Sequence, residues 1–212
     1  MIHALVPVKA LLESKTRLRR LLAGRVVERL AEAMLLDVLD ALRRVPALSR
    51  VVVVTPDSAV AAVAREAGAE ALVRNDPGLN EAIEAGAAAV CTSPDDGLLV
   101  VLGDVAGVRA EEIAQLVAAA PERGVALAPS RDGGSSAVLR RPHDVIPAGF
   151  GPESAARHRQ SAARAGVPYR EIHLPSLAID VDRPEDLEAV LASADPASHT
   201  RAACAALAVP EA

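Results

Sequence analysis

A basic cluster lies close to the start of the chain, directly after an apolar segment. Residues 2–8 are largely apolar, and Lys9, Lys15 and Arg17 follow within a few positions. An apolar run of this length can be buried in a sheet, which would leave the basic residues at the edge of the core. Lys and Arg side chains neutralise phosphate charge, so the cluster suits a polyphosphate ligand. A solvated basic turn ahead of a helix fits the same pattern equally well.

Three acidic residues follow two other apolar runs. Asp104 comes after the run at 98–102, and Asp180 and Asp182 end a later run. Side chains two positions apart in a strand point to the same side, so Asp180 and Asp182 can face one cation. Carboxylates at the ends of neighbouring strands can converge on Mg²⁺, which prefers oxygen ligands. For Asp104 the pattern favours this role, whereas Asp182 fits equally well as the cap of a helix that begins beside Pro184.

A glycine-rich loop divides the second half of the chain. Residues 131–136 contain two glycines and two serines, and a Pro- and Gly-rich segment at 142–152 leads into a helix that contains Ser154 and His158. This pattern predicts a flap over a substrate, although an ordinary surface hairpin fits it as well. His158 lies between two arginines, which favours an anion-contacting or structural role over that of a general base.

The elements that must position these residues alternate between strands and helices. Apolar runs predict strands at 2–8, 50–55, 70–73, 98–102, 125–128, 137–139 and 176–181. Helical periodicity and capping residues predict helices at 24–44, 57–67, 80–90 and 110–119, a fifth one around Ser154 and a sixth after Pro184. This alternation is typical of an α/β fold with a mostly parallel sheet. Ligands of such sheets bind beyond the carboxyl ends of the strands, which predicts a site near Lys9, Pro56, Asp104 and Pro129.

Length and composition favour one large domain. The chain has 212 residues, of which 51% are hydrophobic, and it contains one Tyr, one Phe and no Trp. We therefore expect a core of Ala, Val and Leu in a single domain over residues 1–194, followed by a loosely packed Ala-rich tail at 195–212.

The same composition excludes several classes of partner. The chain lacks a set of aromatic residues on which bases could stack, and its formal net charge is −5, so we expect no nucleic-acid ligand. Two distant cysteines are too few for a disulfide framework or a zinc site, which fits a reducing compartment. Neither an export signal nor an apolar run of ~20 residues is present. These features predict a soluble cytoplasmic protein that does not bind membranes.

Seven short motifs occur in the order seen in one enzyme family. They are Pro7-Val8-Lys9, Lys15-Thr16-Arg17-Leu18, Leu79-Asn80-Glu81-Ala82-Ile83, Gly103-Asp104, Phe150-Gly151-Pro152-Glu153-Ser154, Ala156-Arg157-His158-Arg159 and Asp180-Val181-Asp182-Arg183-Pro184-Glu185-Asp186-Leu187. In these motifs the chain resembles the 2-phospho-L-lactate guanylyltransferases, also called phosphoenolpyruvate guanylyltransferases, of coenzyme F-420 biosynthesis. The resemblance extends from about residue 2 to residue 193. It departs at Val105-Ala106-Gly107-Val108, where many members have Leu-Pro-x-Leu, and at Ser135-Ser136, where members often have Thr.

The resemblance implies a fold and a role for each matching residue. The fold is a single-domain three-layer α/β sandwich with a mixed, mostly parallel central sheet, of the glycosyltransferase-A-like, molybdenum-cofactor-guanylyltransferase type. The nucleotide triphosphate and the acceptor phosphate would be held by Lys9, Lys15 and Arg17, and the guanine or ribose by Asn80. The ligands of the implied Mg²⁺ would be Asp104, Asp180 and Asp182. The acceptor would be bound by Ser136, Gly151 and Ser154.

The implied reaction transfers GMP from GTP to the phosphate of a small phospho-carboxylic acid and releases pyrophosphate. Phosphoenolpyruvate is the favoured acceptor, with 2-phospho-L-lactate next and 3-phosphoglycerate as an alternative. Catalysis would depend on Lys9, Lys15 and Asp104, which position and neutralise phosphates without a protein nucleophile. A cytidylyl- or molybdopterin-type transferase and a non-catalytic GTP-binding regulator remain alternatives. We expect a monomer or homodimer that hands its product to the next transferase of the deazaflavin pathway.

Overall fold

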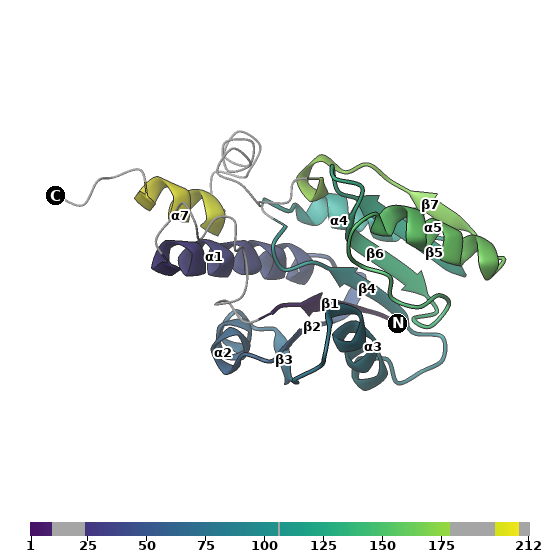
Figure 1. Ribbon diagram of the computed structural model, residues 1–212, viewed down its shortest axis with the longest axis horizontal. Helices are drawn as coiled ribbons and strands as arrows, with labels where there is room; N and C mark the ends of the chain where they lie inside the picture. Colours follow the sequence, from purple (N-terminus) through teal and green to yellow (C-terminus); the bar gives the residue numbers. More distant parts are fainter. Residues whose placement is uncertain (10–23, 106, 179–197, 208–212) are drawn as a thin grey trace.

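A seven-stranded sheet forms the centre of the computed structural model, which describes residues 1–9, 24–105, 107–178 and 198–207 (Figure 1). The strands are β1 (Ile2–Pro7), β2 (Leu48–Thr55), β3 (Glu70–Val73), β4 (Gly97–Val101), β5 (Gly124–Pro129), β6 (Ser135–Arg141) and β7 (Tyr169–Glu171). Their order is β3-β2-β1-β4-β6-β5-β7. Among these strands only β6 is antiparallel to its neighbours, so the prediction of a mostly parallel mixed sheet is confirmed.

Helices cover both faces of the sheet. They are α1 (Gly24–Arg43), α2 (Ser58–Glu66), α3 (Leu79–Val90), α4 (Ala110–Ala119), α5 (Ser154–Arg164), the 3-10 helix η2 (Pro175–Leu177) and α7 (His199–Leu207). Apolar side chains of α1, α2 and α4 pack in a core on one face, and those of α3 and α5 pack in a second core on the other. The described chain is therefore a three-layer sandwich, as expected.

The predicted periodicity accounts for these elements. All six residues of β1 are buried between β2 and β4, as expected for a central strand that is apolar on both faces. In α1, the predicted core positions Val27, Leu30, Met34 and Val38 are fully buried. In such long periodic segments, burial of the apolar face contributes more to the choice of helix or strand than the propensities of single residues do.

The predicted strand at 176–181 is wrong over its first residues, which form η2. Pro175 begins the turn, and the Ser176 backbone N–H and hydroxyl both donate to Glu112 Oε2, at 2.9 and 2.7 Å. The Arg109 N–H in turn donates to Ser176 Oγ at 3.1 Å. These contacts with the start of α4 satisfy the polar groups of the turn without a neighbouring strand. The rest of the predicted strand and the helix expected after Pro184 lie outside the described residues.

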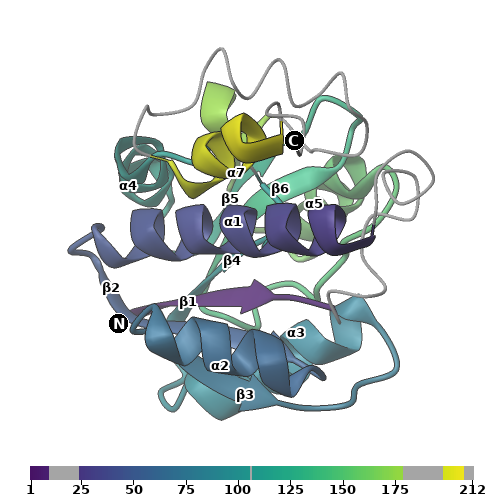
Figure 2. The ribbon, with the colours of Figure 1, turned by 90° about the vertical axis from the view of Figure 1, so that its left-hand side faces the viewer.

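The Ala-rich tail is more ordered than we expected over residues 198–207. Helix α7 lies along α1 in both ribbon views (Figures 1 and 2). Asp37, which is only 7% exposed, accepts hydrogen bonds from the backbone N–H groups of His199 at 2.7 Å and Thr200 at 3.1 Å. A buried carboxylate of α1 therefore satisfies the first N–H groups of α7. The expected domain boundary at residue 194 lies outside the described residues.

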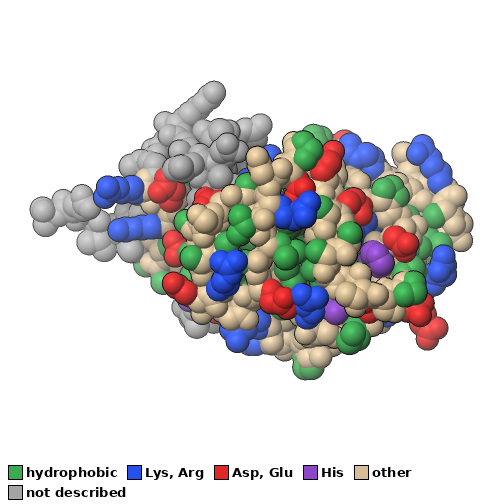
Figure 3. All heavy atoms as spheres, turned by 90° about the horizontal axis from the view of Figure 1, so that it is seen from below, with side chains coloured by type: hydrophobic (Ala, Val, Ile, Leu, Met, Phe, Trp, Pro, Cys, Tyr) green, Lys and Arg blue, Asp and Glu red, His purple; other side chains and the backbone are tan. Residues whose placement is uncertain are grey.

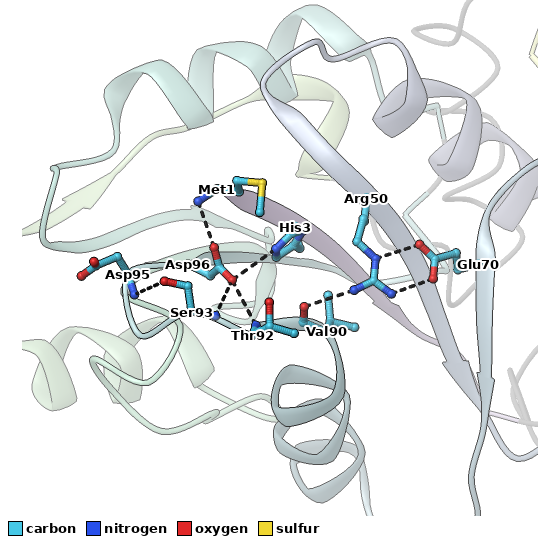
Figure 4. A network of polar contacts seen from close by, with 9 residues as sticks. All are labelled: Met1, His3, Arg50, Glu70, Val90, Thr92, Ser93, Asp95 and Asp96. Atoms are coloured by element: carbon cyan, nitrogen blue, oxygen red, sulfur yellow. Dashed lines mark hydrogen bonds and ion pairs between the residues drawn. The ribbon is translucent and has the colours of Figure 1, made fainter.

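A polar network lies at the amino ends of the central strands (Figure 4). Asp96 is 1% exposed and accepts hydrogen bonds from the N–H groups of Thr92 and Ser93 and from the Met1 ammonium group, at 3.1, 2.9 and 2.9 Å. His3 Nε2 lies 3.5 Å from the same carboxylate. This network is at the edge of the sheet opposite to the predicted site, which indicates a role in stability.

Replacing Asp96 by Asn is expected to destabilise the fold, because the amide lacks the charge that these donors bind. The Ser93 hydrogen bond is the largest cause that holds the pKa of Asp96 well below its usual value. A carboxylate with a lowered folded-state pKa stabilises the fold above its unfolded pKa, and this contribution is lost as the pH falls. The difference in denaturation midpoint between parent and variant should therefore be larger at about pH 7 than at about pH 3. Asp95→Asn, at an exposed neighbour, is the control, and an equal difference at both pH values would contradict the prediction.

The surface seen from below in Figure 3 carries interspersed acidic and basic side chains. This face is formed mainly by α2, β3 and α3. Among the described residues, none of the helices has the length and apolar character that crossing a bilayer requires.

Candidate active site

The carboxyl ends of β1 and β4 bring Lys9 and Asp104 to the same edge of the sheet. The two strands are parallel neighbours, and a Cβ added to Gly103 would lie 2.7 Å from Val8 Cγ2. Gly103 therefore packs against Val8, and its lack of a side chain permits this close approach. Lys9 and Asp104 each follow one member of this contacting pair. The prediction that both lie beyond the carboxyl ends of buried strands is confirmed.

The antiparallel strand β6 adds its amino end to this edge. The Leu102 N–H donates to the Ser136 carbonyl at 3.0 Å, which places Ser136 beside the segment that leads to Asp104. Ser136 itself is only 2% exposed. Ser136, the predicted acceptor-binding residue of β6, thus lies next to the segment that carries the Asp104 carboxylate.

A cavity of about 540 Å³ opens beside Lys9. It is lined by the ends of β1, β2 and β3 and by the start of α3, including Thr55, Asp57, Arg74 and Leu79. Its volume lies within the range of small-molecule sites. The predicted site near Lys9 and Pro56 therefore coincides with a cavity at the carboxyl edge of the sheet.

Arg74 is a candidate that our reading of the sequence missed. Its Nε and Nη2 atoms donate to the two carboxylate oxygens of Asp76, at 3.0 and 3.2 Å, and both residues line the cavity. The hydrogen bond to Asp76 is the largest cause that raises the pKa of Arg74. The signal was available, because Arg74 directly follows the predicted strand at 70–73 in the same way that Lys9 follows the predicted strand at 2–8.

The glycine-rich hairpin and the start of α5 are joined by buried hydroxyl groups. Ser154 Oγ donates to Ser135 Oγ at 3.0 Å, and the Ala155 N–H donates to the Gly133 carbonyl at 3.2 Å. Gly151, which precedes the helix, has φ +123°, a conformation that favours glycine. The structure thus places the predicted acceptor residues Gly151 and Ser154 beside the hairpin that contains Ser136. The direct hydroxyl contact of Ser154 is with Ser135.

His158 is a buried residue of this cluster. Its Nδ1 lies 3.1 Å from Ser135 Oγ, and its Nε2 accepts the Gly149 N–H at 3.1 Å, which requires an unprotonated Nε2. Burial first, and then the positive charges of Arg140 and Arg157, lower the pKa of His158 to about 4. A neutral, fully hydrogen-bonded imidazole supports the structural interpretation of His158 over that of a general base.

Asn80 is held by the backbone of the turn before Gly151. Its Oδ1 accepts the Phe150 N–H at 2.8 Å, and its Nδ2 donates to the Phe150 carbonyl at 3.1 Å. Contact between Asn80 and the guanine or ribose stays a prediction. Asn80 belongs to α3, whose first residue Leu79 lines the cavity.

The remaining predicted site residues lie outside the described residues. These are Lys15, Arg17, Asp180 and Asp182. Within the described ranges, His, Cys, Asp and Glu side chains form no group of three that could hold a metal ion, so Mg²⁺ binding stays a prediction. Asp104 fits such a role, because it offers a half-buried carboxylate at the edge where phosphates are expected.

The segment after Asp104 departs from the expected Leu-Pro-x-Leu pattern but keeps its apolar anchors. Val105 and Val108 are 2% and 6% exposed and pack in the core with residues of α1 and α4. Gly107 has φ +72°, which glycine adopts at little cost. The first and fourth positions of the pattern are therefore filled by smaller apolar residues.

Comparison with known proteins shows which family this chain resembles over most of its length. The family model described as "Guanylyl transferase CofC like" matches residues 2–201. A phosphoenolpyruvate guanylyltransferase of Sphaerobacter thermophilus is 42% identical over 186 residues, which cover 87% of this chain and 90% of the relative. A 3-phospho-D-glycerate guanylyltransferase of Phenylobacterium zucineum is 38% identical over 192 residues, which cover 88% of each chain.

Solved structures share the architecture at lower identity. A candidate nucleotide-diphospho-sugar transferase from Desulfovibrio desulfuricans superposes with a TM-score of 0.79 at 18% identity, covering 97% of this chain and 94% of its own. A nucleotidyl transferase from Methanothermobacter has a TM-score of 0.61 at 20% identity, covering 88% and 94%. These likenesses confirm the predicted glycosyltransferase-A-like fold. Because the family model matches most of the chain and the relatives cover more than four fifths of it, the chain belongs to the CofC-like guanylyl transferase family.

Proposed function

We propose that this protein transfers GMP from GTP to the phosphate of phosphoenolpyruvate. An oxygen of the acceptor phosphate forms a bond to the α-phosphorus of GTP. The bond between that phosphorus and the oxygen bridging to the β-phosphate breaks, and its electron pair leaves with pyrophosphate. A phosphate monoester is already an anion near neutral pH, so the protein contributes positioning and charge neutralisation.

The observation that carries this proposal is the family match over residues 2–201, combined with the meeting of Lys9, Asp104 and Ser136 at one edge of the sheet. The cavity beside Lys9 offers room for the nucleotide, and the hairpin of β5 and β6 lies on the other side of β4. A nucleotide and a small acid bound on the two sides would meet near Asp104.

The role proposed for each residue is the one that the family resemblance implies. Lys9, Lys15 and Arg17 would hold phosphates, and Asp104 with Asp180 and Asp182 would hold Mg²⁺. When bound, Mg²⁺ would neutralise the charge on phosphate oxygens. Ser136, Gly151 and Ser154 would orient the carboxylate of the acceptor. The product would pass to the next transferase of coenzyme F-420 biosynthesis.

A second acceptor, 3-phosphoglycerate, is supported by the Phenylobacterium zucineum relative, which is named for it and is 38% identical. The two acids differ in the carbon that carries the phosphate, C2 in phosphoenolpyruvate and C3 in 3-phosphoglycerate, and in a hydroxyl group in place of a double bond, and a few contacts can distinguish such differences. The identity of the acceptor is therefore the part of the proposal that the two candidate activities do not share.

A panel assay tests the proposal directly. GTP is supplied with phosphoenolpyruvate, 2-phospho-L-lactate or 3-phosphoglycerate in turn, with the next transferase of the pathway added to consume an unstable product. Pyrophosphate release that requires GTP and is fastest with phosphoenolpyruvate is the expected result. Faster release with CTP would favour a cytidylyltransferase, and GTP binding without release with any acceptor would favour a regulator.

Lys9→Ala is expected to weaken binding of GTP or acceptor about tenfold, because it removes a charged phosphate contact. Lys9 is exposed, so added salt should weaken binding by the parent more than by the variant. Titration calorimetry with each ligand measures the effect. Arg123→Ala removes an exposed cation at the amino end of β5, on the opposite edge, and is the control. If Lys9→Ala binds both ligands like the parent, Lys9 belongs to a solvated turn.

A further inference from the structure

The segment of residues 146–150 leads directly to Gly151 and is held by side chains. Residues 147–150 belong to no helix or strand, so their backbone groups require other partners. Six backbone groups of residues 146–150 are bound by side chains of α3, β6 and α5, as the next paragraphs describe. We call residues 146–150 the approach segment.

Helix α3 binds the approach segment at two points. Asn80 makes its two hydrogen bonds to the Phe150 N–H and carbonyl, and one turn later Glu84 Oε1 accepts the Ala148 N–H. Residues four positions apart lie on the same face of a helix. The Phe150 ring is 6% exposed and packs in the same core as Ile83 of α3. Polar and apolar contacts therefore fix the segment against one face of α3.

Helix α5 binds the middle of the approach segment. His158 Nε2 accepts the Gly149 N–H, and Arg157 Nε donates to the Gly149 carbonyl at 3.1 Å. The His158 ring also makes an edge contact with the Phe150 ring, with centroids 5.1 Å apart. A Cβ added to Gly149 would approach His158 Nε2 to 3.4 Å, so the imidazole packs directly against this backbone.

Arg140 of β6 completes the arrangement. It is 1% exposed, and its Nη1 donates to Glu84 Oε1 at 2.8 Å and to the Ile146 carbonyl at 2.9 Å. Its charge also helps to lower the pKa of His158, so that Nε2 stays free of a proton and can accept the Gly149 N–H. Burying a guanidinium costs free energy that an ion pair and hydrogen bonds offset in part, and the two bonds of Nη1 join the sheet, α3 and the approach segment.

We propose that Asn80, Glu84 and His158 are positioning residues for the acceptor, which hold the approach segment so that Gly151 lies at a fixed place relative to the nucleotide cavity. Helix α3 carries both parts of this arrangement, because its first residues line the cavity and its side holds the segment. The inference rests on the proposed function and gives Asn80 a role through Phe150 and Gly151. In this role Asn80 positions the acceptor and differs from a residue that contacts the guanine or ribose.

The test compares how each variant changes the KM for the acceptor and the KM for GTP. Asn80→Ala should raise the KM for the acceptor about tenfold while the KM for GTP changes less than about twofold, because two hydrogen bonds to the approach segment are lost. Asn80→Asp keeps the acceptor of the Phe150 N–H and should recover part of the effect. Glu84→Gln should act in the same direction, and its effect should be non-additive with that of Asn80→Ala. Glu81→Gln changes an exposed carboxylate of the same helix and is the matched control.

Hydrogen exchange of the Gly149 and Phe150 amides separates failure of this inference from failure of the proposed function. Faster exchange in Asn80→Ala, with an unchanged unfolding midpoint, is expected. An equal rise in both KM values would assign Asn80 to the nucleotide and overturn the inference, as would unchanged exchange. If the parent transfers no GMP to any acceptor, the proposed function is wrong, whereas the exchange experiment still tests whether Asn80 and Glu84 anchor the segment.

Discussion

Asp104→Asn is expected to reduce the rate of GMP transfer by ~10²-fold or more, since it removes a charge at the point where we propose that nucleotide and acceptor meet. The substitution barely changes the size of the side chain, and the carboxylate is half-buried at the end of a sheet whose core it does not enter. Folding should therefore persist. The measurement is kcat/KM for both substrates, accompanied by the unfolding midpoint of each variant.

The control for this substitution is Asp95→Asn, an identical change at an exposed residue on the opposite edge of the sheet. If Asp104 helps to hold Mg²⁺, the variant should also require more Mg²⁺ to reach half of its maximal rate. Unchanged transfer in Asp104→Asn would leave Asp104 as a residue of the loop before α4. A large loss of rate without a change in the Mg²⁺ requirement would separate its catalytic contribution from metal binding.

The parts of the fold that follow from local pattern were predicted from the sequence. The apolar runs that became β1, β2, β3 and β4 form parallel strands, and the rule that ligands bind beyond their carboxyl ends identified the edge with Lys9 and Asp104. Buried strands and amphipathic helices show their environment in their own residues. The same rule applied to β3 would also have identified Arg74.

The parts that depend on contacts between distant segments were not predicted. Asp37 binds the start of α7 from 162 and 163 positions away in sequence, and Ser176 forms a turn because Glu112 accepts its donors. The attachment of Phe150 to Asn80 spans 70 positions. Such contacts leave no period or local motif in the sequence, so only the three-dimensional arrangement shows them. The sequence therefore did not indicate that the Asn80 amide is bonded to the approach segment, whereas its contact with the nucleotide stays a prediction.

Gly151→Val is expected to raise the KM for the acceptor by roughly tenfold to a hundredfold while GTP binding changes little. The residue has φ +123°, which a branched side chain adopts only with strain, and an added Cβ would lie 3.2 Å from Arg157 Nη2. The substitution should therefore move the backbone that we propose contacts the acceptor. Gly166→Val is the matched control, because Gly166 also has a positive φ, +65°, but lies just after α5 with no other atom within 4 Å of an added Cβ.

Ser154→Ala tests the same division of the site, between residues that bind GTP and residues that bind the acceptor, without backbone strain. It removes the hydroxyl that donates to Ser135 Oγ, in a cluster where both side chains are almost fully buried. We propose that the same hydroxyl orients the acceptor, and an acceptor oxygen left without its partner costs ~1–3 kcal/mol, so the acceptor KM should rise by roughly fivefold to a hundredfold. Equal losses for GTP and acceptor in both variants would contradict the assignment. A carboxylate bound away from the Gly151 turn in a liganded crystal structure would do the same, because the hairpin and this turn would then support the fold without orienting the substrate.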